Sequence, residues 1–125
     1  MKLFTIEEAN ALLPSVREIL QKMSRWRRRL AAFRGQAEKA AASADQGGGG
    51  MPGGALYAVA LTNFGEAMSQ LDGLGVQLKD PERGLVDFPS MREGKVVLLC
   101  WQLGEGDELE WWHDLDAGFA GRTPL

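Results

Sequence analysis

Apolar residues recur at alternating spacings of four and three along the first third of the chain. This stripe continues for more than four heptads and narrows to alanine toward its far end. Such a repeat is typical of a long helix that packs lengthwise against another helix, and the alanines require that partner to approach closely. The stripe consists of Leu12, Val16, Ile19, Met23, Trp26, Leu30, Phe33, Ala37, Ala40 and Ala44.

The start of this helical region is marked by Thr5 and Glu8, which have the spacing of a capping box. In such a box the hydroxyl and the carboxylate each accept a hydrogen bond from a backbone N–H of the first turn. Pro14 lacks the N–H that a continuous helix needs. We therefore predict a short helix from Thr5, a kink near Leu13, and then a long helix that ends at residue 44.

Residues 45–54 contain six glycines and one proline, and we interpret them as a flexible glycine-rich loop. The same spacing resumes over residues 55–74, which predicts a second helix. Its stripe consists of Tyr57, Leu61, Phe64, Met68 and Leu71. Antiparallel packing pairs Phe33 with Leu61, Leu30 with Phe64, Trp26 with Met68 and Met23 with Leu71. The two helices are expected to form a coiled-coil-like hairpin.

The last fifty residues show the alternating pattern of short strands. We expect strands at 75–80, at 85–88 with Pro89 as the end, at 95–103 and at 108–113, followed by an irregular tail over 114–125. The third strand is apolar on both faces, so it belongs in the centre. The predicted fold class is α+β: a long antiparallel helical hairpin packed on a small antiparallel β-sheet of about four strands, in a single domain.

The formal net charge of −3 hides an asymmetry along the chain. Residues 1–44 carry nine basic and four acidic side chains, whereas residues 45–125 carry five and thirteen. The densest basic run, residues 25–29, spreads its arginines around the helix, which disfavours nucleic-acid binding because no flat phosphate-tracking stripe results. We expect a solvated helix face or a charge-matched contact with another subunit.

Composition also predicts where the protein works. The longest apolar run, residues 96–101, is too short to cross a bilayer as a helix. The N-terminus reaches acidic residues before any apolar stretch of signal-peptide length. The only cysteine, Cys100, cannot form an internal disulfide. These features predict a cytoplasmic protein that does not contact a membrane.

The last two strands bring the only imidazole of the chain toward the only thiol. If Leu103 pairs with Glu108, then Leu98 lies opposite His113, and Cys100 becomes a diagonal neighbour of His113 at about 7 to 8 Å. The two side chains could form a nucleophilic pair or provide two metal ligands. Alternatively, they are a core thiol and a hydrogen-bonded histidine at its rim.

Six carboxylates and no lysine or arginine lie between positions 105 and 116. Together with His113, Glu105 and Asp114 are candidate ligands of a divalent metal ion, and the alternative is a solvated acidic rim. No other cofactor is predicted, because no complete nucleotide, metal or catalytic motif is present.

Three tryptophans fall on neighbouring predicted strands. If Trp111 points the same way as Cys100, then Trp101 and Trp112 lie on the opposite face of the sheet. One face must cover the helices, and the other is a pocket wall or a contact surface.

Four segments of the sequence resemble, in combination, a bacterial domain of unknown function, family 2203. They are Phe4-Thr5-x-Glu7-Glu8-Ala9-Asn10-x-Leu12-Leu13-Pro14, Gly84-Leu85-Val86-Asp87-Phe88-Pro89, Leu99-Cys100-Trp101-x-x-Gly104-Glu105, and Trp112-His113 with Gly118-Phe119-x-Gly121-Arg122. The resemblance covers nearly the whole chain and implies no activity. It directs attention to seven candidate ligand-binding residues: Asp87, Cys100, Trp101, Glu105, Trp112, His113 and Arg122.

These residues allow two interpretations. They could line a pocket for a small anionic or aromatic ligand, with Arg122 pairing a carboxylate or phosphate. Alternatively, an ion pair from Arg122 to Asp87 or Glu105 fixes the tail on the sheet, which we favour because a glycine-rich tail needs fixed points.

The sequence therefore favours a non-enzymatic module that self-associates, as a homodimer, or binds a protein partner through the helices or the tryptophan face. The alternative is a small enzyme, or a protein that binds a metal or small ligand, with a site around Cys100 and His113.

Overall fold

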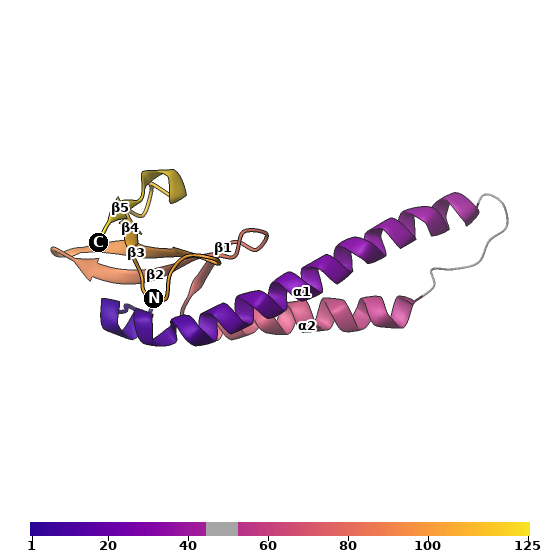
Figure 1. The fold of residues 1–125 in the computed structure, drawn as a ribbon, viewed down its shortest axis with the longest axis horizontal. Coiled ribbons are helices and arrows are strands. Elements are labelled where there is room, and N and C mark those ends of the chain that lie inside the picture. The colour runs from indigo at the N-terminus through magenta and orange to yellow at the C-terminus, as the bar shows by residue number, and fades with distance from the viewer. Residues whose placement is uncertain (45–52) are drawn as a thin grey trace.

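The computed structural model describes residues 1–44 and 53–125, which form two helices packed on a five-stranded antiparallel sheet (Figure 1). Helix α1 spans Ile6–Ala44 and helix α2 spans Gly54–Gly73. The helices form a hairpin that extends well beyond the sheet, so the predicted α+β class is confirmed. Most of the predicted glycine-rich loop, residues 45–52, lies outside the described part of the chain.

The capping box at the start of α1 forms as predicted. The backbone N–H of Thr5 donates to Glu8 Oε1 at 3.1 Å, and the backbone N–H of Glu8 donates to Thr5 Oγ1 at 3.0 Å. The hydrogen bond from the Thr5 backbone lowers the pKa of the Glu8 carboxyl. Such a cap stabilises a helix by about 1 kcal/mol and fixes where α1 begins.

The predicted division of α1 into a short and a long helix is wrong, because α1 runs through Pro14 as one helix. Pro14 lies on the exposed side, so the carbonyl of Asn10 that loses its helical donor can bind water. The opposite side buries Ala9, Leu13 and Val16 completely. Burial of these side chains offsets a proline cost of about 3 kcal/mol.

The seam of the hairpin differs from the predicted pairing on the side of α2. Ala60 and Ala67 are buried in it, whereas Leu61 and Met68 are 51% and 42% exposed. Phe33 makes an edge-to-face contact with Tyr57, with ring centroids 5.8 Å apart, instead of the predicted contact with Leu61. Two alanines let the helix axes approach closely. Helix α2 therefore turns the stripe that contains Ala60 and Ala67 toward α1, instead of the predicted stripe with Leu61 and Met68.

The strands follow the chain in order across the sheet, β1-β2-β3-β4-β5. Their bounds are Gln77–Asp80, Leu85–Arg92, Lys95–Gln102, Trp111–His113 and Thr123–Pro124, and a 3-10 turn, η1, spans Phe119–Gly121. The central position of β3 is confirmed. The last predicted strand begins three residues later than expected, at Trp111, and the tail adds β5 as a fifth strand.

Pro89 does not end β2, contrary to expectation; it pairs with Leu98 inside the strand. The carbonyl of Pro89 accepts a hydrogen bond from the N–H of Phe4 at 2.7 Å, so this position faces the N-terminal segment. Because the N–H and C=O of a strand residue point the same way, the missing donor of Pro89 does not interrupt the ladder to β3. The Ser90 hydroxyl donates to the Phe4 carbonyl at 2.6 Å and closes this edge.

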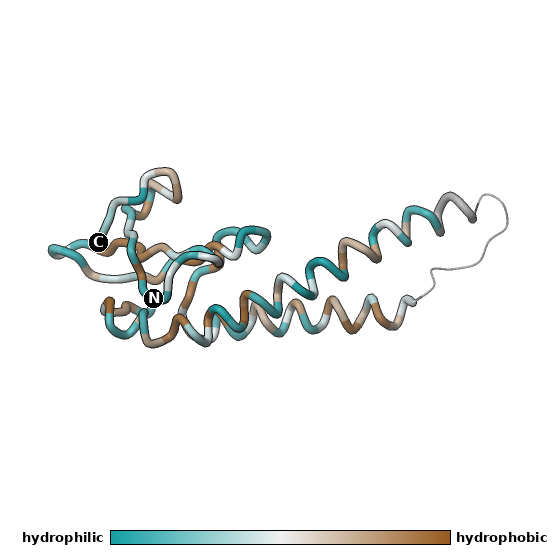
Figure 2. The backbone as a smooth tube through the Cα atoms, in the orientation of Figure 1, coloured by the Kyte–Doolittle hydropathy of each residue, from teal (hydrophilic) through white to brown (hydrophobic). Residues whose placement is uncertain are grey.

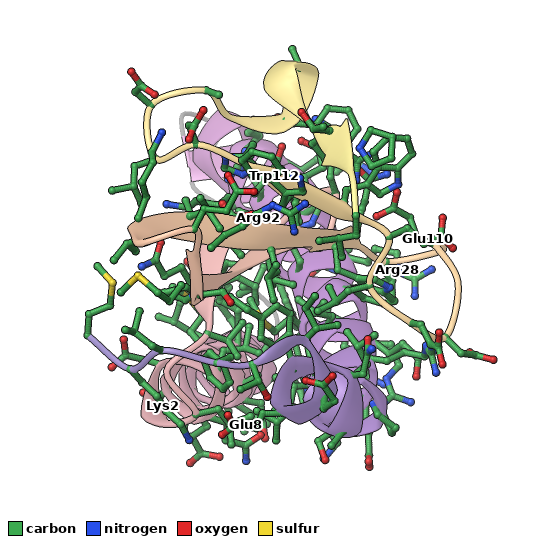
Figure 3. All side chains as sticks on the ribbon, turned by 90° about the vertical axis from the view of Figure 1, so that its left-hand side faces the viewer. Lys2, Glu8, Arg28, Arg92, Glu110 and Trp112 are labelled. Carbon is green, nitrogen blue, oxygen red and sulfur yellow. The ribbon has the colours of Figure 1, made fainter. Side chains whose placement is uncertain are left out.

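The two faces of the sheet have different covers. One face packs on the helices, with Phe88, Leu99 and Trp101 in the same buried cluster as Leu13 and Val16. The C-terminal segment with β5 and η1 lies on the side of the sheet away from the helices (Figures 1 and 3). Within residues 1–44 and 53–125, neither helix has the length and apolar character needed to cross a membrane.

Candidate functional site

Three chemically active side chains meet on the face of the sheet that the helices do not cover. Asp87 on β2 pairs in register with Cys100 on β3, and Leu98 of β3 pairs with His113 on β4. The predicted β3–β4 register is therefore confirmed. Asp87, Cys100 and His113 are 2%, 1% and 3% exposed, and one ligand atom from each lies within 4.8 Å of the others. We call these three residues the central triad.

Both ring nitrogens of His113 face oxygen atoms. Nδ1 lies 2.7 Å from the backbone carbonyl oxygen of Asp114, which can only accept, so Nδ1 carries a hydrogen and donates it. Nε2 lies 3.1 Å from both carboxylate oxygens of Asp87. One further proton must therefore lie between the imidazole and the carboxylate, either on Nε2 or on the carboxyl group.

Cys100 completes the triad as a protonated thiol. Burial, reinforced by the neighbouring Asp87 charge, raises the pKa of the Cys100 thiol to about 12. A free nucleophilic cysteine needs the opposite shift, because the thiolate is the reactive form. The structure therefore brings Cys100 and His113 together as the sequence predicted, in an environment that does not activate the sulfur as a nucleophile.

Arg122 holds the C-terminal tail over the triad. Its Nη1 donates to Glu105 Oε1 at 3.0 Å and to Oε2 at 2.9 Å, and it lies 4.0 Å from the Cys100 sulfur. The guanidinium also lies over the rings of Trp111 and Phe119, at 4.9 and 4.0 Å from their centroids. Of the two predicted partners of Arg122, Glu105 is the one that forms the ion pair.

The tryptophans do not form the exposed face that the sequence suggested as a contact surface. Trp101 is 1% exposed, faces the helices, and donates from Nε1 to the carbonyl of Gly106 at 2.9 Å. Trp112 is half-buried against the same cluster, and Arg92 lies 4.8 Å from its ring centroid (Figure 3). These side chains fill the core because the long helix α1 covers this face of the sheet.

The predicted metal ligands Glu105 and Asp114 are engaged elsewhere. The Glu105 carboxylate binds Arg122 and accepts a hydrogen bond from the Gln102 backbone N–H at 2.7 Å, and the Asp114 carboxylate lies 3.3 Å from Lys95 Nζ. Among the described residues, the central triad is the one group of three such side chains close enough to share an ion. Asp87 was a candidate ligand-binding residue, but the sequence did not place it beside the sulfur.

Comparison with known protein families finds similarity over almost the whole chain. A family model described as "Uncharacterized conserved protein (DUF2203)" matches residues 2–125. The chain belongs to the DUF2203 family. The match spans both helices and every strand, so the hairpin and the strand half are parts of one family unit. Neither the curated proteins nor the solved structures that were compared gave a match.

A second notable feature of this DUF2203 protein is the surface of α2. Leu61 and Met68 are 51% and 42% exposed, and Tyr57, whose ring also contacts Phe33 in the seam, remains 38% exposed. Their spacing places the three residues along one side of the helix, beside the seam. We call them the outer stripe. No charged residue occurs from Gly54 to Gly65, and apolar colouring dominates α2 in Figure 2. A surface helix normally carries charges on its solvated side, so this side of α2 is suited to a contact.

Proposed function

We propose that this DUF2203 protein is a non-enzymatic assembly module that forms a homodimer through the outer stripe of α2. The observation that carries the proposal is the combination of exposed apolar side chains and missing charge on the first twelve residues of α2. A helical hairpin leaves one side of each helix without a partner, and a second hairpin is the simplest cover for that side.

A two-fold axis through Leu61 gives the stripe a self-complementary register. In an antiparallel pairing of two α2 helices, residues whose numbers are equally far from 61 meet, as an isologous interface requires. Tyr57 then meets Gly65 of the partner subunit, and Met68 meets Gly54 of the partner subunit. Among residues 1–44 and 53–125, nothing lies within 4 Å of a Cβ atom added at Gly65 or Gly54, so the described part of the chain leaves space above both glycines. The large side chains therefore meet positions that have room for them.

The charge distribution favours a second copy of this chain, rather than an unrelated apolar helix, as the partner of the outer stripe. The antiparallel pairing directs the outer end of α1, which carries Arg34 and Lys39 on its exposed surface, toward the strand half of the other copy. The first 44 residues are net basic and the remainder net acidic, so each copy offers the opposite charge to its partner. A single thiol, buried and without a second cysteine, suits assembly in the reducing cytoplasm.

Leu61→Glu tests the proposal directly. In a dimer the substituted carboxylates meet at the axis, and like charges in an interface cost several kcal/mol, so we expect the dissociation constant to rise at least ~100-fold. Light scattering after size-exclusion chromatography over a range of concentrations measures the change. Leu115→Glu is the matched control, because Leu115 is 57% exposed in the C-terminal tail, away from α2.

A cross-linking measurement checks the register independently. Leu61→Cys places two thiols at the axis, so a short bis-maleimide should link two copies, whereas Leu115→Cys should not be linked. The buried Cys100 does not compete for the reagent. A wild-type protein that stays monomeric at all concentrations, or a dimer that Leu61→Glu leaves intact, would refute the proposed interface. A wild-type monomer at all concentrations would instead indicate that the outer stripe binds a helix of another protein.

A further inference from the structure

We propose that the central triad of Asp87, Cys100 and His113 is a binding site for one zinc ion per chain. This inference is independent of the proposed dimer, because the triad lies on the sheet and the outer stripe lies on α2. The proposal rests on four features: the chemical types of the three donors, the fixed orientation of the imidazole, the charges around the sulfur, and the paired strands that position the ligands.

The donor set fits zinc in type and in geometry. Sulfur, imidazole nitrogen and carboxylate oxygen are the three ligand classes that Zn²⁺ binds in proteins, at about 2.0 to 2.3 Å. Ligands of a tetrahedral ion at those lengths lie roughly 3.3 to 3.8 Å from one another. The Nε2 atom is already 3.1 Å from both Asp87 oxygens, and all three ligand atoms lie within 4.8 Å, so small side-chain rotations suffice.

The imidazole is oriented as a metal ligand would be. Metal-binding histidines usually donate their second N–H to a carbonyl or carboxylate, which fixes the ring and the tautomer. The bond from His113 Nδ1 to the Asp114 carbonyl at 2.7 Å has this role. It leaves Nε2 as the nitrogen whose lone pair points toward Asp87 and Cys100 once its proton is lost.

The charges also balance. A thiolate and a carboxylate together neutralise a divalent cation, and the Arg122–Glu105 pair beside the sulfur is neutral as a unit. Binding replaces the thiol proton and the proton shared by His113 and Asp87, so two protons leave for each Zn²⁺ that enters. Three protein ligands leave a fourth tetrahedral position for water or a small anion.

The site lies on three adjacent strands, with β2 and β4 each paired to β3, which fixes its shape before an ion arrives. The backbone positions of Asp87 and Cys100 are set by the β2–β3 ladder, and that of His113 by the β3–β4 ladder. The tail that carries Arg122 covers the site, so we expect metal exchange to be slow while the Arg122–Glu105 pair is intact. Residues on strands give more precise ligand geometry than residues on loops.

The test is titration of the full-length, chelator-treated protein with Co²⁺, followed by displacement with Zn²⁺. We expect one equivalent of Co²⁺ per chain, with visible bands of tetrahedral cobalt and a near-ultraviolet sulfur-to-cobalt charge-transfer band. Cys100→Ser removes the sulfur and should abolish the charge-transfer band, and Asp87→Asn should weaken Co²⁺ binding at least ~10-fold. Asp114→Asn is the matched control and should bind Co²⁺ like the wild type, because the Asp114 backbone carbonyl holds His113 while the Asp114 carboxylate lies 3.3 Å from Lys95 Nζ.

X-ray absorption of the zinc-loaded wild-type protein gives a result that does not depend on how the variants fold. One sulfur neighbour per zinc supports the site. Absence of stoichiometric binding, or a bound ion with no sulfur neighbour, overturns it. Binding that survives Cys100→Ser and disappears with Asp114→Asn would also overturn it, by assigning the ion to the acidic surface instead.

Discussion

The ion pair between Arg122 and Glu105 should hold the tail on the sheet, and Arg122→Met tests this role. Methionine keeps much of the apolar length that packs on Trp111 and Phe119 but removes the charge and the hydrogen bonds. Glu105→Gln is the matching change on the other side. It keeps an oxygen that can accept the hydrogen bond from the Gln102 backbone N–H.

The size of the effect follows from burial. The side chains of Arg122 and Glu105 are 13% and 23% exposed, so the pair lies between a surface pair, worth about 0 to 1 kcal/mol, and a fully buried pair, whose disruption costs about 3 to 5 kcal/mol. We expect Arg122→Met to lower the free energy of unfolding by about 2 to 3 kcal/mol. For a domain of this size the melting temperature should fall by about 10 °C.

Urea denaturation of the wild type, both single variants and the double variant measures this loss as a double-mutant cycle. The measurements should be made with a chelator present, so that metal binding does not contribute. We expect a coupling energy of at least about 1 kcal/mol and faster hydrogen exchange over residues 114–125 in Arg122→Met. Additive losses, with coupling below about 0.5 kcal/mol, would show that the pair does not stabilise the tail.

Three further substitutions test two local features of the fold. Gly84 and Gly94 both have positive φ, at 64° and 78°, but a Cβ atom on Gly84 would lie 2.7 Å from the Cβ of Leu103 whereas one on Gly94 meets nothing within 4 Å. In urea denaturation, we expect Gly84→Ala to lower the free energy of unfolding by about 3 kcal/mol and Gly94→Ala to lower it by about 1 kcal/mol. Equal losses would contradict the close approach of Leu103 to position 84. Folding raises the pKa of Cys100 from 9.0 to about 12, so the thiol's contribution to stability is complete below pH 9 and is lost as the pH rises toward 12. Relative to Cys100→Ser, the wild type should lose about 1.4 kcal/mol per pH unit in that range, and parallel stability profiles would be inconsistent with it.

Much of the architecture could be predicted from periodicity and turn length. The capping box placed the start of α1, and the turn after Leu103 was enough to give the register of Leu98 with His113. The phase of α2 was not determined in this way. Tyr57, Phe64 and Leu71 belong to both possible stripes, which differ in whether Leu61 or Ala60 faces α1. The sequence favours Leu61 because it is larger. In the structure the helices approach closely, so Ala60 lies in the seam.

Only two of the three residues of the central triad could be paired from the sequence. Cys100 and His113 could be paired through the β3–β4 turn, but Asp87 joins them through the β2–β3 register. The prediction that the strand ends at Pro89 concealed that register, because it left out of the strand the residues that lead to the hairpin at Gly94. A proline is compatible with a strand when its missing donor faces away from the neighbouring strand, and that depends on a contact with Phe4, far away in the sequence.

The contact between Phe4 and the Pro89–Ser90 segment has a consequence for the order of events during synthesis. It joins positions separated by more than eighty residues, so the beginning of the chain cannot reach its final place until β2 has left the ribosome. Until then, the apolar side of the nascent α1 has no sheet to cover it. Helix α1 can therefore bury its apolar side only after the sheet has been synthesised. A chain that stalls before residue 90 exposes this apolar surface to chaperones and proteases.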